Sequence, residues 1–233
     1  MICDLNCDLG ELDDLALEAR LMEQIASANI ACGGHAGDEA TMERTIRLAI
    51  ARGVHVGAHP GYPDRANFGR IEMAMTEAEI EDTVARQIAR LHAVATRLGA
   101  TIEHVKPHGA LYNRAARDRA VAHAIGAAVK RTLADGSACP TLVGLARSAM
   151  LDEWREMGLR VAAEGFADRR YEADGTLRPR RLAGALIVDP GKAAAQAVRL
   201  VRAGGIDTIC VHGDTPGAAD ILQACRRALQ SGR

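Results

Sequence analysis

Short apolar runs rich in β-branched residues alternate along the chain with longer segments whose apolar residues recur every three or four positions. This alternation predicts parallel β/α units, in which each strand is followed by a helix that packs on the sheet. Seven runs are expected to be strands, at residues 2–7, 28–32, 54–58, 103–107, 141–144, 159–163 and 208–212. The pattern therefore predicts an α/β fold built as a seven-stranded parallel, TIM-like barrel.

Several of the longer segments also carry readable helix starts. Asp38 is expected to be the N-cap of the helix that follows the second strand. Thr76 and Glu79 have the spacing of a capping box ahead of a long amphipathic helix. Thr215 and Pro216 are expected to supply a cap and a first-turn proline to the last helix.

The least regular stretch is the arginine-rich segment 166–183. It is expected to form a long basic loop, with a short hairpin that turns at Asp174-Gly175. Loops of this length in compact proteins tend to be functional lids or disordered segments. No linker or shift in composition marks a boundary, so residues 1–233 are expected to form one domain.

Composition limits the classes of partner. The net charge is −1 and only 3% of the residues are aromatic, so neither nucleic acid nor an anionic membrane is expected as a partner. No stretch approaches the roughly 20 apolar residues that span a bilayer. The six cysteines form no C-x-x-C pair and are expected to be reduced, mostly buried thiols. The first residues resemble a strand rather than a signal peptide, which favours a cytoplasmic protein.

Ionisable residues stand at or just beyond the carboxyl ends of six predicted strands. These ends meet at one mouth of a parallel barrel, where barrel enzymes hold their catalytic residues. Residues two apart in a strand share a face, so Asn6 accompanies Asp8 and Lys106 accompanies His108. The side chains expected at the mouth are Asp8, His35, His59, His108, Glu164, His212 and Asp214.

Other polar residues fit structural roles better. His55 and His104 lie deeper in their strands and are expected to be hydrogen-bonded core histidines. His92 and His123 fall within helices and are expected at the surface. Asp4 either takes part in the site or simply orients its neighbours.

Six sequence motifs occur in an order that resembles a known family. They are DLNCDLGE (4–11), SANIACGGHAGD (27–38), GAHPGYPD (57–64) followed by FGR (68–70), HVKPHGALYN (104–113), FADR (166–169) and DTICVHGDTPG (207–217). Together they resemble the LamB/YcsF family over essentially the whole chain.

This resemblance implies a barrel of the glycoside hydrolase/deacetylase type. It also implies the 5-oxoprolinase reaction, the ATP-dependent opening of 5-oxo-L-proline (pyroglutamate) to L-glutamate, carried out together with two partner subunits, B and C. The sequence has no G-x-x-x-x-G-K-[ST] loop for ATP phosphates. We therefore expect ATP to be handled with the partner subunits, while this chain binds the lactam and assists its activation or hydrolysis.

On this hypothesis a side chain with a pKa near neutrality activates water, and Asp8, His59 and His108 are the candidates. Lys106 and His212 would stabilise the developing negative charge. Arg169 and Arg170 of the basic loop would help to bind the substrate carboxylate, because a guanidinium matches that group. The residues expected to bind substrate are Asn6, His35, Glu164, Arg169 and Asp214.

Two other interpretations remain open. The first is a metal-dependent amide or deacetylase-type hydrolase, with Asp8, His35 and either His59 or His108 as ligands. No closely spaced H-x-x-x-H pair supports it, and the sequence does not decide whether a divalent metal is bound. The second is a subunit that holds the lactam for its partners without catalysing the reaction.

Overall fold

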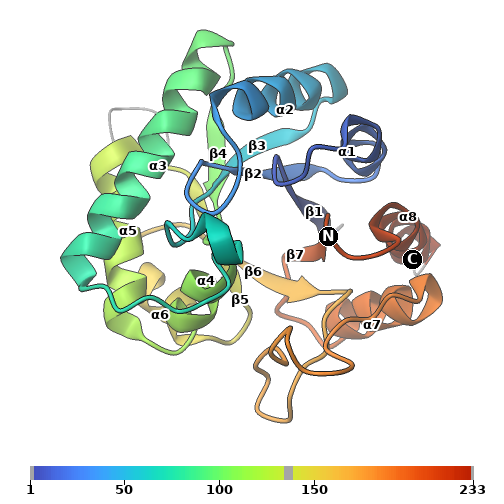
Figure 1. The fold of residues 1–233 in the computed structure, drawn as a ribbon. Coiled ribbons are helices and arrows are strands. Elements are labelled where there is room, and N and C mark those ends of the chain that lie inside the picture. The colour runs from blue at the N-terminus through green and yellow to red at the C-terminus, as the bar shows by residue number, and fades with distance from the viewer. Residues whose placement is uncertain (1–2, 134–138, 232–233) are drawn as a thin grey trace.

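The computed structural model describes residues 3–133 and 139–231. Seven parallel strands close into a barrel in chain order, with β1 hydrogen-bonded to both β2 and β7. The α/β barrel predicted from the sequence is therefore confirmed (Figure 1). The strands are β1 (Asp4–Leu9), β2 (Ser27–Ala31), β3 (His55–His59), β4 (Ile102–Val105), β5 (Thr141–Leu145), β6 (Val161–Phe166) and β7 (Thr208–His212).

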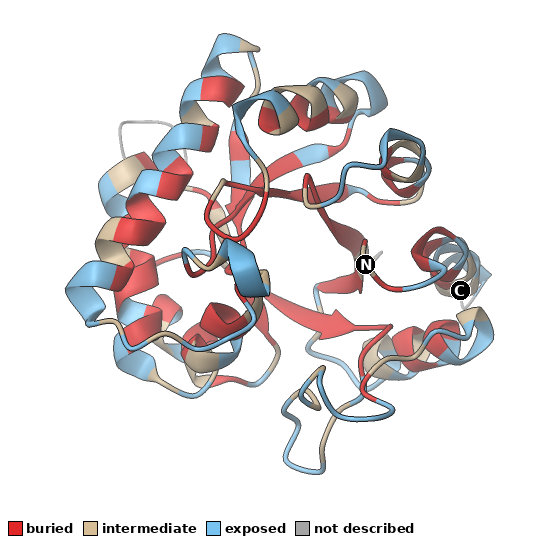
Figure 2. Ribbon diagram, viewed as in Figure 1, coloured by how far each residue is buried: buried red, intermediate tan, exposed pale blue. Residues whose placement is uncertain are grey.

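Helices surround the barrel and bury one face each against the strands. Figure 2 shows buried residues on the strands and on the inner helix faces, while the outer helix faces are exposed. The helices are α1 (Leu15–Met22), α2 (Glu39–Arg52), α3 (Glu77–Arg97), α4 (Gly109–Ala115), α5 (Arg119–Leu133), α6 (Ala149–Glu156), α7 (Pro190–Arg202) and α8 (Ala218–Ser231), with a 3-10 turn η1 at Arg65–Asn67. None of the helices in the described part of the chain is long and apolar enough to cross a membrane.

Two of the three predicted helix starts are confirmed. Asp38 caps α2, and Thr76 and Glu79 form a capping box at α3. The prediction for Thr215 is wrong, because its hydroxyl donates to the Asp168 carboxylate at 2.5 Å and α8 begins only three residues later. The buried Asp168 carboxylate is a strong acceptor, and its hydrogen bond holds the Thr215 hydroxyl at the barrel mouth.

Strands β1 and β6 lie further along the chain than predicted. β1 starts at Asp4, and Ile2 of the predicted run lies outside the described residues. β6 runs from Val161 to Phe166 rather than ending at residue 163. Both shifts bring a carboxylate, Asp8 or Glu164, into the strand itself. Each carboxylate is paired inside the barrel, so the strand continues through a polar position.

The prediction that His55 is a core histidine is wrong. Its side chain is 58% exposed at the start of β3 and contacts Glu103 at the surface, so it is not a core histidine. His104 is buried and lies 2.8 Å from Asn29, as expected of a core histidine. Alternation along a strand fixes the face on which a side chain lies but not its depth in the barrel, which explains the different outcomes.

The barrel interior is polar over much of its length. Asn6 donates to Thr208 at 2.7 Å, and Asn29 donates to both Asn6 and Asp8. Asp4 accepts from Thr208 and Ser27 at the opposite end from the predicted mouth, so it orients neighbours rather than entering the site. Buried polar groups are tolerated here because each finds a hydrogen-bond partner.

The segment between β6 and α7 projects outward beside α7 (Figure 1). Its predicted hairpin is confirmed by bridges between Tyr171 and Leu177 and between Arg169 and Leu186. Gly175 has φ of 85°, which suits the tight turn. The hairpin forms part of the wall of the barrel mouth.

Candidate active site

Lys106 is the centre of a buried ion-pair network at the carboxyl ends of the strands. Its Nζ lies 2.9 Å from Asp8 Oδ1 and 2.8 Å from Glu164 Oε1, with all three side chains at most 3% exposed. It also lies 3.1 Å from Cys210 Sγ. Tyr112 donates to the second oxygen of Glu164 at 2.8 Å, so this carboxylate is held from two sides.

The charged forms of Asp8 and Lys106 support each other. Burial disfavours both ions, but attraction to His59 and Lys106 holds the pKa of Asp8 well below its usual range. Burial likewise opposes the ammonium, while Asp8, Cys210 and Glu164 raise the pKa of Lys106 above its usual range. The site therefore keeps a fixed ammonium beside ionised carboxylate at neutral pH.

Three histidines and Glu11 form a second cluster next to Asp8. His59 Nε2 lies 2.9 Å from His108 Nδ1 and 3.3 Å from Asp8 Oδ2. Glu11 Oε1 lies 3.1 Å from His35 Nε2 and 3.2 Å from His108 Nδ1. The ligand-type atoms of Glu11 and the three histidines are close enough to share a metal ion.

The local environments push the histidine pKa values apart. Burial opposes the charge on His59, but Asp8 raises its pKa above the usual value. Burial outweighs the effect of Glu11 at His108 and lowers its pKa. Burial and the neighbouring His108 lower the pKa of His35 to about 3. Of these three histidines only His59 has a raised pKa, because the adjacent Asp8 carboxylate favours its charged form.

His212 and Asp168 form a dyad on the other side of Asp8. His212 Nδ1 lies 3.1 Å from both carboxylate oxygens of Asp168, and the backbone N–H of His212 donates to the same group at 3.1 Å. Burial disfavours the Asp168 carboxylate, but His212 and a hydrogen bond from Thr215 lower its pKa to about 2. Since the carboxylate accepts from Nδ1–H, the free Nε2 of His212 faces Asp8, 4.0 Å away.

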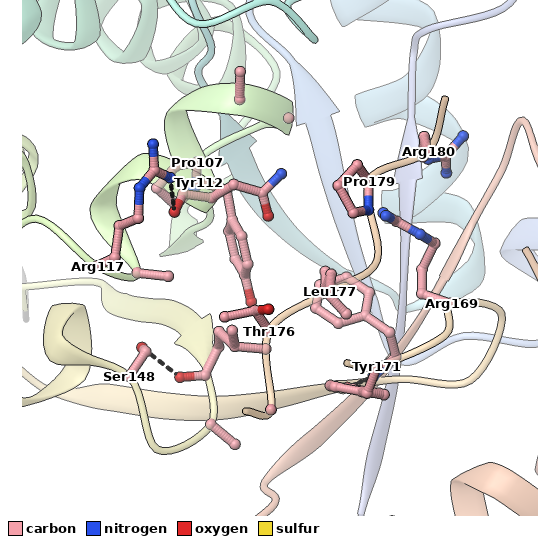
Figure 3. A pocket seen from close by; sticks show the side chains of 18 of the residues that line it. Pro107, Tyr112, Arg117, Ser148, Arg169, Tyr171, Thr176, Leu177, Pro179 and Arg180 are labelled. Atoms are coloured by element: carbon pink, nitrogen blue, oxygen red, sulfur yellow. Dashed lines mark hydrogen bonds between the residues drawn. The ribbon is translucent and has the colours of Figure 1, made fainter. Parts of the chain in front are cut away.

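A pocket of about 1440 Å³ opens over these groups. Figure 3 shows Tyr112 and Arg117 on one side of it and Arg169 and Arg180 on the other. Burial and the nearby Arg180 lower the pKa of Arg169 to about 10. Asp214 accepts from Arg180 at 2.9 Å, yet Arg169 Nε and Arg180 Nη2 are buried without a protein partner. These free donors suit an anionic ligand.

The structure gathers the predicted site residues into two layers. Those that line the pocket are Asp8, His59, Lys106, His108, Arg169 and His212. The other four touch lining residues from behind. Asn6 and Glu164 contact Lys106, His35 stacks on His108 with ring centroids 3.6 Å apart, and Asp214 pairs with Arg180.

Three polar residues of the site were not assigned a role from the sequence. Glu11, Asp168 and Tyr112 all lie within the family-like motifs, and that was the available signal. Glu11 and Asp168 follow strand ends in loops, where no periodicity indicates a direction. Tyr112 lies in α4, which starts directly after His108 and turns the phenol towards Glu164.

Comparison with known proteins shows where these motifs recur. Residues 3–233 match the LamB/YcsF family. A protein of Chloroflexus aggregans, named as the A subunit of 5-oxoprolinase, is 50% identical, over 98% of this chain and 95% of its own length. The protein of the same name from Bordetella pertussis is 45% identical, over 97% of this chain and 94% of its own length.

Solved structures agree with the sequence matches. The lactam utilization protein of Thermus thermophilus superposes with a TM-score of 0.88 at 40% identity, covering 100% of this chain and 97% of that chain. A GH113 β-1,4-mannanase superposes with a TM-score of 0.58 at 11% identity, covering 99% of this chain and 100% of that chain. The second likeness extends to the barrel fold alone.

Proposed function

The chain belongs to the LamB/YcsF family, and on that premise we propose that it is the A subunit of a 5-oxoprolinase that opens 5-oxo-L-proline to L-glutamate with hydrolysis of ATP. The names of its full-length relatives support this proposal. The single structural observation that carries it is the buried Lys106 ammonium, held between two carboxylates beneath the pocket. A fixed positive charge in a dry site stabilises the negative charge that develops on the substrate oxygen during its activation and hydrolysis.

The His212–Asp168 dyad is the best-placed group to activate water. Its free Nε2 faces the pocket side of Asp8, and its Nδ1–H is held by a buried carboxylate, an arrangement that orients an imidazole as a general base. We therefore propose His212 as the base, a different role from the one expected from the sequence. Lys106 retains the proposed role of charge stabilisation, and Asp8 holds its ammonium in place.

A lactam resists water because amide resonance must be lost and nitrogen must leave. Phosphoryl transfer from ATP to the amide oxygen would remove that resistance. Water then adds to the ring carbon, the carbon–nitrogen bond breaks, and the nitrogen takes up a proton. A second water releases the phosphate. The overall reaction consumes the lactam, ATP and two waters, and it yields L-glutamate, ADP and phosphate.

The arginines suit the anionic groups of such a substrate. Arg169 and Arg180 each present a buried N–H donor with no protein partner, and both line the pocket. We propose that they bind the ring carboxylate or the transferred phosphoryl group. The volume of about 1440 Å³ exceeds that of most small-molecule sites, about 300–1,000 Å³, and leaves room for a partner segment or nucleotide.

We propose that subunits B and C handle ATP and that the complex works in the cytoplasm, where ATP is available and the free cysteines stay reduced. The test is ATP-dependent glutamate release from the three purified subunits, with each omitted in turn. This chain alone is expected to release no glutamate with or without ATP. Robust release by the isolated chain would contradict the proposal, and release without ATP would favour a metal-dependent amide hydrolase.

The same assay distinguishes catalysis from simple lactam binding. A His212→Asn variant that assembles and binds 5-oxoproline but releases little glutamate would exclude a purely binding role. Unchanged turnover in that variant would favour the binding role instead.

A further inference from the structure

His59 and His108 face each other with nitrogens whose partners are incomplete. His59 Nδ1 lies 2.7 Å from the backbone carbonyl oxygen of Lys106, and His108 Nε2 lies 2.9 Å from that of Phe68. A carbonyl oxygen only accepts, so each of these nitrogens carries a hydrogen. In the neutral rings the remaining nitrogens, His59 Nε2 and His108 Nδ1, then hold lone pairs, and they lie 2.9 Å apart.

A carboxylate oxygen of Glu11 points at the space between these two nitrogens. Glu11 Oε1 lies 3.2 Å from His108 Nδ1 and 3.7 Å from His59 Nε2. All three side chains are at most 4% exposed. Three acceptors that converge in a buried space repel one another unless a positive centre lies between them.

We propose that this space is a divalent transition-metal site, with His59 Nε2, His108 Nδ1 and Glu11 Oε1 as the protein ligands. Imidazole with carboxylate is a donor set that suits zinc, cobalt, manganese or iron(II). Metal-binding histidines also usually donate their other N–H to a backbone carbonyl or carboxylate, as both of these do. Three protein ligands leave coordination positions for water or substrate.

The local charge supports a divalent ion. The connected buried groups include three carboxylates, Asp8, Glu11 and Glu164, and one ammonium, Lys106. Carboxylates therefore outnumber the ammonium around the proposed position, and this local excess of acidic groups favours a bound cation.

His35 belongs to the cluster but not to the proposed ligand set. Its ring is parallel to that of His108, with an angle of 3° and a centroid separation of 3.6 Å. A metal ion lies near the plane of the imidazole that binds it, so two stacked rings cannot both direct a lone pair at one ion. His35 Nε2 instead lies 3.1 Å from Glu11 Oε1, where it positions the carboxylate.

Cobalt(II) is a suitable probe because its bound form absorbs visible light. The full-length chain is stripped with a chelator and titrated with cobalt(II), with the bound ion counted by equilibrium dialysis. We expect one ion per chain and a rise in melting temperature. Glu11→Gln and His108→Asn should each weaken cobalt binding by at least about 100-fold. His55→Gln, an exposed histidine at the other end of β3, is the matched control and should bind normally.

Two outcomes would overturn the site. One is wild-type chain that binds no cobalt, zinc or manganese and shows no rise in melting temperature, which would assign the space to a proton shared by the two rings. The other is cobalt binding that both variants leave unchanged. The wild-type titration decides the matter even where a variant fails to fold. No lactam, ATP or partner is present, so failure of the proposed reaction and failure of this site are separate results.

Discussion

Lys106 and Glu164 form a fully buried ion pair, with Nζ and Oε1 2.8 Å apart, although they come from parts of the barrel that are not neighbouring strands. Asp8 completes the arrangement on the other side of the ammonium. One cation thus pairs with two carboxylates, and all three side chains are almost completely buried. Its removal would leave both carboxylates without their counter-charge, which gives Lys106 a structural as well as a chemical role.

We predict that Lys106→Met lowers the free energy of unfolding by about 3–5 kcal/mol, the usual cost of leaving buried charge unpaired. From the sequence alone, loss of this ammonium could have been neutral or stabilising, and the two contacting carboxylates reverse that expectation. Glutamate release by the three-subunit mixture should fall at least about 100-fold. Urea denaturation and the release assay measure the two effects, with the exposed Lys192→Met as control.

A second substitution separates the effect of Lys106→Met on stability from its effect on activity. Lys106→Met combined with Glu164→Gln removes one of the stranded charges, so it should recover part of the lost stability and none of the activity. Activity within about threefold of wild type in the single variant, against the 100-fold loss expected for a charge-stabilising group, would remove Lys106 from the proposed mechanism.

Asp168→Asn should disable His212 without removing it. An amide can donate to His212 Nδ1, which would move the imidazole proton to Nε2 and leave the base without its lone pair. We predict a fall in kcat on the order of 10²–10⁴-fold with a smaller change in KM. Steady-state kinetics of the assembled complex measures both. Asp220→Asn, an exposed carboxylate paired with Arg20, should change neither. Equal losses in the two variants would argue against the dyad.

Position 57 has room only for glycine, because the His104 side chain packs directly over it. A Cβ at this position would lie 2.0 Å from His104 Nε2. Gly57→Ala should therefore destabilise the protein by about 1–3 kcal/mol, the usual cost of overpacking a core. Gly191→Ala in the exposed first turn of α7 would place a Cβ 3.3 Å from Oδ1 of Asp189, an exposed side chain that can shift slightly, so it should change stability by less than about 1 kcal/mol. Thermal melting of the two variants side by side checks the contrast.

The positions that the sequence placed well are those that obey strand alternation. Asp8 and Lys106 were expected on inward faces, and they meet inside the barrel at 2.9 Å. His55 shares the face of His59 by the same parity but lies at the other end of the strand, in solvent. Alternation reports direction, whereas depth depends on how neighbouring strands are staggered, and that is a property of the closed barrel.

The contacts that the sequence did not supply are those made by loops. Glu11 reaches His108 after a turn at Gly10, whose φ is 69°, and no periodicity describes such a path. Asp168 joins His212 across 44 positions of sequence because β6 and β7 are adjacent in the barrel. Both residues lie within recognisable motifs, so the family resemblance located them without indicating their contacts.

The buried histidines predict how stability depends on pH. Burial and the nearby Lys106 lower the pKa of His104 to about 3, and the pKa of His35 is also about 3. In the unfolded chain both titrate near 6.5. Between these values the unfolded chain binds more protons than the folded one, so stability is complete above about pH 6.5 and falls as the pH drops towards about 3. Each histidine contributes a slope of up to about 1.4 kcal/mol per pH unit.

His104→Gln should flatten that dependence by about one proton, because the amide keeps a donor for Asn29 but does not titrate. The variant is expected to be less stable than wild type near neutral pH and to lose stability more slowly as acid is added. Urea denaturation over this pH range gives the slope for each protein. His123→Gln removes an exposed histidine that pairs with Glu153, and it should leave the slope close to that of wild type. If His104→Gln and wild type show the same slope, His104 takes up a proton in the folded protein as readily as in the unfolded chain.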